Sequence, residues 1–234
     1  MKLNLNTNIY NEFDKISSIL GKNNVYLVGG IVRDSLLGRE TKDLDIATSL
    51  NPEVVHSLFK NSLYFKKYGT TSFKENCISV TIASLRKEKA YLDYRHPTEI
   101  EFISDIYEDY KRRDFTINAL YATSSLDIID PSNEGLADLN SKKIKMIGLP
   151  QIRLKEDPLR IIRAYRFSLE LGFFIDDSIK LFASENKELL HQLNPQKIRE
   201  EISKIPSDLR NNLINDLSLD FVYNSSEKWG WLWK

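Results

Sequence analysis

The feature that most constrains the fold is the stretch NVYLVGGIVRDSLLGRETKDLDIAT at residues 24–48. The β-branched and aromatic run Val25–Val28 ends in two glycines, which predicts a strand followed by a tight turn. Residues 31–37 have a helical pattern that stops at Gly38, and residues 44–47 indicate a second strand. Further strand-like runs at 77–85 and 99–102 extend the pattern. The first part of the chain is therefore expected to be an α/β domain.

Two aspartates, Asp43 and Asp45, stand two residues apart on the second expected strand. Residues with that spacing on a strand point to the same face, so the two carboxylates converge. Carboxylates that close repel each other, and Mg²⁺ takes one or two of them together with water and substrate phosphates. The pair fits a metal site for phosphoryl transfer. An Asp-x-Asp pattern alone is more commonly a solvent-exposed acidic edge, and that alternative stays open.

The glycine pair that precedes these aspartates has its own chemical possibilities. Gly29 and Gly30 lie between a strand and a helix, where backbone N–H groups can approach a phosphate. Any tight strand–helix turn also favours glycine, so the pair alone is a weak signal. Arg33, one turn into the helix, can reach the same phosphate or form a salt bridge with Asp34.

A basic triplet at residues 111–113 is followed by Asp114 and an apolar run that contains Asn118. Basic residues next to such a run usually form a solvated face. Asp114 and Asn118 are less usual there, because together they can accept and donate hydrogen bonds to a ribose.

From about residue 155 the pattern becomes helical throughout. EDPLRIIRAYRFSLELGF has apolar residues at helical spacing, with Asp157 before Pro158 as the start and Gly172 as the stop. The segments 176–191 and 195–205 continue this pattern, and the second opens on Asn194-Pro195. We therefore expect an α/β domain over residues 1–150 and a small all-helical domain over 151–234.

Charged residues recur along the first of these helices. Arg160, Arg163 and Arg166 are spaced by three and form a slowly drifting stripe, and Asp157 precedes Arg160 by three. One interpretation is an intrahelical ion pair with surface arginines. The other is that Asp157 and Arg160 present a carboxylate and a planar guanidinium to the edge of a nucleotide base.

The composition narrows the class of protein. Hydrophobic content of 41% and charged content of 28% are typical of a soluble globular protein, and no run is long and apolar enough to predict a membrane span. The single cysteine, Cys77, excludes an internal disulfide and favours a cytoplasmic location. Thirty-three basic and thirty-three acidic residues balance, so no polyanionic partner follows from net charge. The three histidines are dispersed, which argues against a zinc site.

Five motifs in a fixed order resemble one known family. The chain is similar to the class II tRNA nucleotidyltransferase (CCA-adding enzyme) and bacterial poly(A) polymerase family of the DNA polymerase beta superfamily. The resemblance covers roughly residues 24–205 and rests on these motifs: LVGGIVRDSLLGRETKDLDIAT, DYRHPTEIEF, RRDFTINAL, IIDPSNEGLADL and EDPLRIIRAYRFSLELGF.

The resemblance implies a fold and a role for each matching residue. It implies a mixed nucleotidyltransferase sheet flanked by helices (the head domain), followed by a small helical neck domain, with the family's body and tail domains absent or reduced. Asp43 and Asp45 match the catalytic, metal-binding carboxylates. The remaining matches are nucleotide-binding positions: Gly29, Gly30 and Arg33 for phosphates, Arg113 for the nucleotide, Asp114 and Asn118 for the ribose, Asp157 and Arg160 for the base, and Arg163 and Arg166 for further contacts.

The implied activity is template-independent addition of C, C and A to the 3′ end of tRNA from CTP and ATP. Mg²⁺ would be the cofactor, pyrophosphate the second product, and tRNA the partner. Within the enzyme class, CC-only addition, A-only addition and poly(A) synthesis are alternatives. A CC-only enzyme is expected to have a shortened segment at RKEKAYLDYRHP. This stretch is not shortened here, so full CCA addition is favoured. From another class, the chain would be an inactive RNA-binding remnant of the family.

Overall fold

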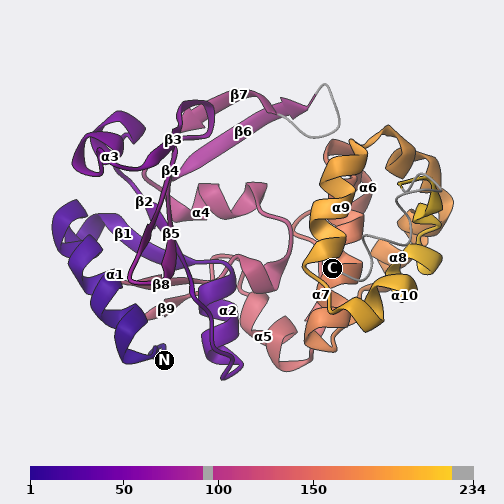
Figure 1. Cartoon of the computed structure of the whole chain (residues 1–234), viewed down its shortest axis with the longest axis horizontal. Helices are drawn as coiled ribbons and strands as arrows, with labels where there is room; N and C mark the ends of the chain where they lie inside the picture. The colour runs from indigo at the N-terminus through magenta and orange to yellow at the C-terminus, as the bar shows by residue number, and fades with distance from the viewer. Residues whose placement is uncertain (92–96, 223–234) are drawn as a thin grey trace. The chain divides into compact units, whose positions relative to one another are not determined.

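The computed structural model describes residues 1–91 and 97–222, which divide into two compact units (Figure 1). The first unit contains residues 1–89 and 99–139, and the second contains residues 90–98 and the chain from 140 onward. The division after Leu139 falls earlier than the boundary near residue 150 that the sequence predicts.

The first unit is built on a seven-stranded sheet with the order β3-β4-β5-β2-β1-β8-β9. Of these neighbours, β2 and β5 are parallel and the other pairs are antiparallel, which confirms the predicted mixed sheet. The strands are β1 (Val25–Val28), β2 (Asp43–Thr48), β3 (Leu63–Phe65), β4 (Thr70–Glu75), β5 (Ile78–Ser84), β8 (Tyr121–Thr123) and β9 (Ile128–Ile129). Asn76 and Cys77 have positive φ in the turn between β4 and β5, so the strand starts one residue later than predicted.

Helices and most of a two-stranded arm complete this unit, while residues 90–98 of the arm are assigned to the second unit. The elements are α1 (Thr7–Leu20), α2 (Gly30–Leu36), α3 (Pro52–Leu58), α4 (Ile106–Asp109), α5 (Gly135–Asn140), and the β6 (Arg86–Tyr91) and β7 (Pro97–Phe102) pair. Asn51 caps α3 by accepting a hydrogen bond from the backbone N–H of Glu53, as the Asn-Pro pattern predicts. Both α1 and α2 contact β2.

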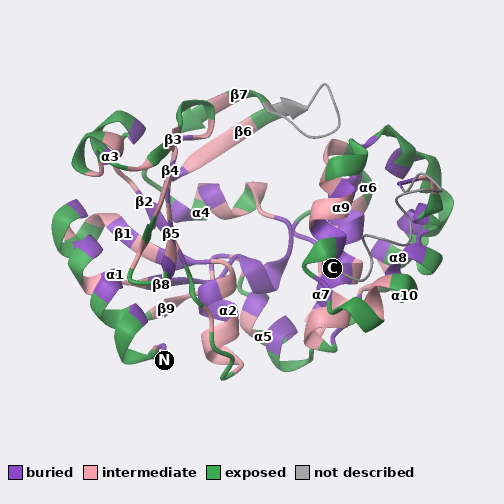
Figure 2. Ribbon diagram, in the orientation of Figure 1, coloured by how far each residue is buried: buried purple, intermediate pink, exposed green. Residues whose placement is uncertain are grey.

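The core of the first unit lies on both faces of the central strands (Figure 2). On β2, Leu44 and Ile46 point to one face and are fully buried. Ala47 points to the other face and packs in a buried cluster whose other members are Val28, Leu85, Ile106 and Tyr121. Because side chains alternate along a strand, Asp43 and Asp45 share the face of Ala47.

The second unit is predominantly helical, as expected. Its helices are α6 (Pro150–Glu156), α7 (Leu159–Leu171), α8 (Asp177–Glu185), α9 (Pro195–Ser203) and α10 (Arg210–Asp216). Gly172 ends α7 in the left-handed conformation and Asn194 caps α9, both as predicted. A parallel pair of two-residue strands, β10 (Lys143–Ile144) and β11 (Phe174–Ile175), corrects the all-helical expectation. Over residues 1–91 and 97–222, no helix has the length and apolarity to cross a membrane.

A test of the packing between α5 and the turn at 116–118 uses Gly135. A Cβ at this position would lie 2.7 Å from the carbonyl oxygen of Thr116, whose hydroxyl donates to the carboxylate of Asp138. We expect Gly135→Ala to lower the free energy of unfolding by about 2 kcal/mol, although alanine is the better helix former. Chemical denaturation measures this. Unchanged or increased stability would contradict the close approach.

Candidate active site

The central strand β2 carries the two aspartates that the sequence singled out. It pairs with β1 on one side and with β5 on the other, so its position in the sheet is held from both edges. Asp43 is exposed at the start of the strand, and Asp45 is partly buried beside Thr81 of β5. The structure therefore brings both carboxylates to one face of the sheet.

The electrostatics of this pair are unfavourable for two negative charges. Burial, and after it the repulsion of Asp43, raise the pKa of Asp45, which lies at about 6. Arg113 and Arg33 act in the opposite direction and offset part of it. A divalent cation between the carboxylates would remove the repulsion, so the donor set fits a hard metal ion. Within the described residues, no group of three or more His, Cys, Asp and Glu side chains is arranged as a metal site.

The glycine turn lies against the same carboxylates. Gly29 has φ 78°, and a Cβ there would lie 3.9 Å from Oδ2 of Asp45 and 4.0 Å from the carbonyl oxygen of Asn118. Gly30 follows as the first residue of α2. The positive φ favours glycine at position 29 because L side chains are strained there. The turn after β1 thus passes beside the Asp45 carboxylate, and because Gly29 has no side chain it leaves the space next to that carboxylate unfilled.

Arg33, Asn118 and Asp114 form one hydrogen-bonded chain, although they come from distant parts of the sequence. The Arg33 side chain is buried and donates to both carboxylate oxygens of Asp34 at 2.9 Å. It also donates 2.7 Å from Nη1 to Oδ1 of Asn118. Asn118 in turn donates to Oδ1 of Asp114, which also accepts from the backbone N–H of Phe115. The Asp34 partner that the sequence left as an alternative for Arg33 is present.

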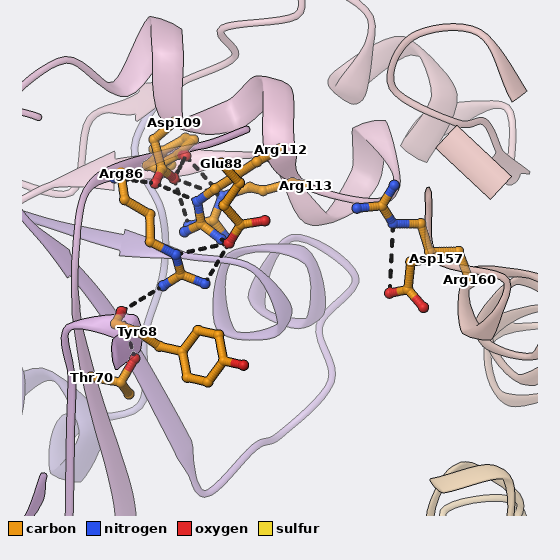
Figure 3. Close-up of polar contacts among 10 residues, drawn as sticks. Tyr68, Thr70, Arg86, Glu88, Asp109, Arg112, Arg113, Asp157 and Arg160 are labelled. Atoms are coloured by element: carbon orange, nitrogen blue, oxygen red, sulfur yellow. Dashed lines mark hydrogen bonds and ion pairs between the residues drawn. The ribbon is translucent and has the colours of Figure 1, made fainter. Parts of the chain in front are cut away.

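Sequence reasoning missed the residue that holds Arg113. Asp109, at the end of α4, is completely buried, and its carboxylate accepts from Nε of Arg112 and from Nε and Nη2 of Arg113 (Figure 3). It also accepts from the backbone N–H of Arg86 and the hydroxyl of Tyr121. The spacings of three and four between Asp109 and the two arginines were the available signal. The basic triplet that looked like a solvated face is thus partly internal.

In the second unit, Asp157 and Arg160 are neighbours, but not as an ion pair inside one helix. Asp157 lies between α6 and α7 with extended backbone, and its Oδ1 accepts from the backbone N–H of Leu159. Arg160 is buried, and its Nη1 donates to the carbonyl oxygen of Arg153. Its Nε lies 3.9 Å from Oδ2 of Asp157 (Figure 3). Both side chains are held by the helix junction, so they form a preset carboxylate–guanidinium pair.

Arg163 and Arg166 converge on one buried carboxylate of α9. Arg166 donates from Nε to Glu201 at 2.8 Å and from Nη1 to Glu170 at 2.6 Å, and Nη1 of Arg163 lies 3.7 Å from Glu201. Burial alone would raise the pKa of Glu201, but Arg163 and Arg166 hold it below its usual value. This contact joins α7 to α9. The expected nucleotide contacts of the two arginines stay a prediction.

The raised pKa of Asp45 gives a pH-dependent test. Its folded-state pKa of about 6 exceeds the ordinary 3.8, so its contribution to stability is complete below pH 3.8 and is lost as the pH rises through 6. Asn at this position cannot ionise. At pH 8 without divalent cations, we expect the free energy of unfolding of Asp45→Asn to exceed that of the unaltered chain by about 1 to 2 kcal/mol. The difference between the two proteins should vanish near pH 4. If they are equally stable at pH 8 as well as at pH 4, the raised pKa of Asp45 is refuted.

The Glu201 contact gives a second test. We expect Glu201→Gln to lower the free energy of unfolding by about 3 kcal/mol, because two arginines lose their buried counter-charge. The neighbouring Glu200, whose side chain is 43% exposed, pairs with Lys197, and Glu200→Gln is the matched control with an effect within about 0.5 kcal/mol. Similar losses for the two variants in urea denaturation would contradict a special role for Glu201.

Known proteins share both the sequence and the fold. The poly(A) polymerase head domain family matches residues 25–145. The CCA-adding enzyme of Lactobacillus delbrueckii subsp. bulgaricus is 41% identical over 181 residues, which are 77% of this chain and 46% of that enzyme. The Bacillus stearothermophilus CCA-adding enzyme in complex with CTP superposes with a TM-score of 0.79 at 29% identity, over 96% of this chain and 59% of that one.

A further solved structure is a tRNA nucleotidyltransferase complexed with a primer tRNA and an incoming ATP analog. It has a TM-score of 0.66 at 28% identity and covers 90% of this chain and 60% of that one. The chain spans about half the length of the curated relatives it matches. Because the head-domain match extends over residues 25–145, just over half of the 234 residues, the chain belongs to the tRNA nucleotidyltransferase and poly(A) polymerase family.

Proposed function

We propose that the chain catalyses template-independent addition of C, C and A to the 3′ end of tRNA, using CTP and ATP. The single observation that carries this proposal is the pair Asp43 and Asp45 on one face of β2, next to the Gly29 turn. The relatives named as CCA-adding enzymes, and the solved structures with CTP, an ATP analog and tRNA, support the same substrates.

In the proposed reaction, the 3′ hydroxyl oxygen of the tRNA attacks the α-phosphorus of the nucleotide. The bond from that phosphorus to the bridging oxygen breaks, pyrophosphate leaves, and the hydroxyl proton is released. Asp43 and Asp45 would hold Mg²⁺, which would neutralise the triphosphate and favour the ionised hydroxyl. We assign the triphosphate to the Gly29-Gly30 turn, Arg33 and Arg113, whose rigid supports reduce the reorganisation needed on binding.

We assign the ribose to Asp114 and Asn118, which are already joined by a hydrogen bond. Base recognition is assigned to Asp157 and Arg160 of the second unit, with Arg163 and Arg166 nearby on α7. A carboxylate and a guanidinium can match the hydrogen-bonding edges of cytosine and adenine, and a wrong base would leave such buried groups unpaired. We propose a head domain over residues 1–150 and a neck domain over residues 151–234, which contain most of the first and of the second unit respectively.

Three alternatives use the same chemistry: CC-only addition, A-only addition and poly(A) synthesis. The unshortened stretch RKEKAYLDYRHP supports full CCA addition, and its residues 92–96 lie outside the described residues. An inactive RNA-binding remnant is the alternative from another class. The raised pKa of Asp45 argues against it, because a remnant has no use for a destabilising carboxylate pair. The free, exposed thiol of Cys77 fits the cytoplasm as the proposed location.

The direct test is incorporation. The purified chain is incubated with Mg²⁺, CTP, ATP and tRNA that lacks its 3′ CCA, and the products are sequenced. We expect CCA ends, and a loss of at least about 100-fold for Asp43→Asn, because the metal loses a ligand charge. Asp177→Asn is the control at a side chain that is 97% exposed, with an effect within about twofold.

The products separate the alternatives. Ends with only CC, only A, or long A tails would replace CCA addition by the corresponding activity. No incorporation by the unaltered chain, with tRNA still bound, would select the remnant. Equal incorporation by the unaltered chain and Asp43→Asn would overturn the assignment of the aspartate pair.

A further inference from the structure

We propose that Asp109 is the positioning residue that holds the Arg113 guanidinium on the catalytic face of the sheet, in the orientation that takes the incoming nucleoside triphosphate. This inference rests on the proposed function, because it concerns how the same site binds its nucleotide. Asp109 itself is not expected to touch the nucleotide, since it is completely buried.

The hydrogen bonds of Asp109 account for both of its carboxylate oxygens. Oδ1 accepts from the Arg86 backbone N–H at 3.0 Å and from Nε of Arg112 at 2.9 Å. Oδ2 accepts from the Tyr121 hydroxyl at 2.6 Å, and from Nε and Nη2 of Arg113 at 3.1 and 3.0 Å. Nε of Arg113 also donates to the Tyr121 hydroxyl at 2.8 Å. Nε and Nη2 of Arg113 share the single acceptor Oδ2, and together with the Tyr121 hydroxyl they restrict the orientation of the guanidinium more than one contact would.

The sheet determines where this guanidinium lies. The Arg113 guanidinium lies over the ring of Tyr121, 5.1 Å from the ring centroid. Tyr121 pairs with Val28, the last residue before the glycine turn, and packs in one cluster with Ala47. Ala47 shares its face of β2 with Asp45. The bonds of Asp109 therefore hold Arg113 on the same face as the catalytic carboxylates.

The charge of Asp109 persists at any working pH. Burial alone would raise the pKa of this carboxyl, but Arg113 and Arg112 outweigh the effect and hold the pKa well below its usual value. Only 16% of the Arg113 side chain is exposed, so loss of its counter-charge would leave a largely buried cation free to turn or to draw in water. A nucleotide would then bind to a site that must first be ordered.

A purely structural role for Asp109 is distinguished by a matched control in the same ionic cluster. Glu88 is nearly buried, at 9% exposure, and pairs with Arg86 and Arg112 at 2.8 and 3.5 Å (Figure 3). Asp109→Asn and Glu88→Gln each remove one buried negative charge from the cluster. Both should lower the melting temperature, but Asp109 is the carboxylate that binds Arg113 directly, whereas Glu88 pairs with Arg86 and Arg112.

The experiment measures Kd for CTP and ATP by calorimetry, and KM and kcat for incorporation, well below all melting temperatures. We expect Asp109→Asn to raise both Kd and KM by about tenfold with a smaller change in kcat, and Glu88→Gln to change Kd by less than about twofold. In an Arg113→Lys background, Asp109→Asn should add less than about twofold to Kd, because the guanidinium it positions is gone.

If Asp109→Asn does not fold, Tyr121→Phe takes its place in the experiment. That change keeps the ring and removes the hydroxyl shared by Asp109 and Arg113, and we expect a rise in Kd of about threefold. Three outcomes would each overturn this inference without affecting the proposed function. The folded variant binds nucleotide with the same Kd as the unaltered chain, Glu88→Gln raises Kd equally, or Asp109→Asn raises Kd undiminished in the Arg113→Lys background. Absence of CTP and ATP binding by the unaltered chain would instead overturn the proposed function, and this inference with it.

Discussion

The strand β2 holds the carboxylates of Asp43 and Asp45 close together despite their repulsion, and the proposed active site of the first unit depends on this constraint. β1 and β5 hold β2 from both sides, so the two carboxylates cannot move apart by shifting the strand. Burial and the neighbouring charge raise the pKa of Asp45 to about 6. Nearby positive charge stabilises such a pair of carboxylates, and Arg33 and Arg113 supply part of that charge. The proposed function uses these opposite charges to hold a cation and an anionic triphosphate on the same face.

The arginines of both units are themselves held by acidic partners. Arg33 pairs with Asp34, Arg113 with Asp109, and Arg166 with Glu201. A guanidinium has five N–H donors in a fixed plane, so a carboxylate that grips one edge orients the remainder of the group. Their support explains how a chain with equal numbers of acidic and basic residues can present ordered positive charge. Asp34, Asp109 and Glu201 are therefore structural partners of these arginines.

Much of this arrangement is predictable from sequence, for specific physical reasons. The strand before Gly29, the aspartates on a common face, the Asn51 and Asn194 caps and the stop at Gly172 follow from side-chain periodicity and backbone preferences. The β10–β11 pair has two residues per strand, too few for any periodic signal. The burial of Asp109 depends on Tyr121 and Arg86 from other strands, so the local YEDYKRR pattern could not reveal it. Asp157 begins α7 as expected, because its carboxylate accepts from the backbone N–H of Leu159, whereas the separate helix α6 that ends just before it was not expected.

The central claim is that Asp43 and Asp45 together hold a divalent cation for nucleotidyl transfer. Crystals of the chain grown with CTP and Mn²⁺, a substitute for Mg²⁺ with an anomalous signal, test it most directly. The account predicts an anomalous peak within about 2.5 Å of carboxylate oxygens from both aspartates, with triphosphate oxygens completing the coordination. An ordered CTP with no peak between these carboxylates, or with the metal bound elsewhere, would contradict the account.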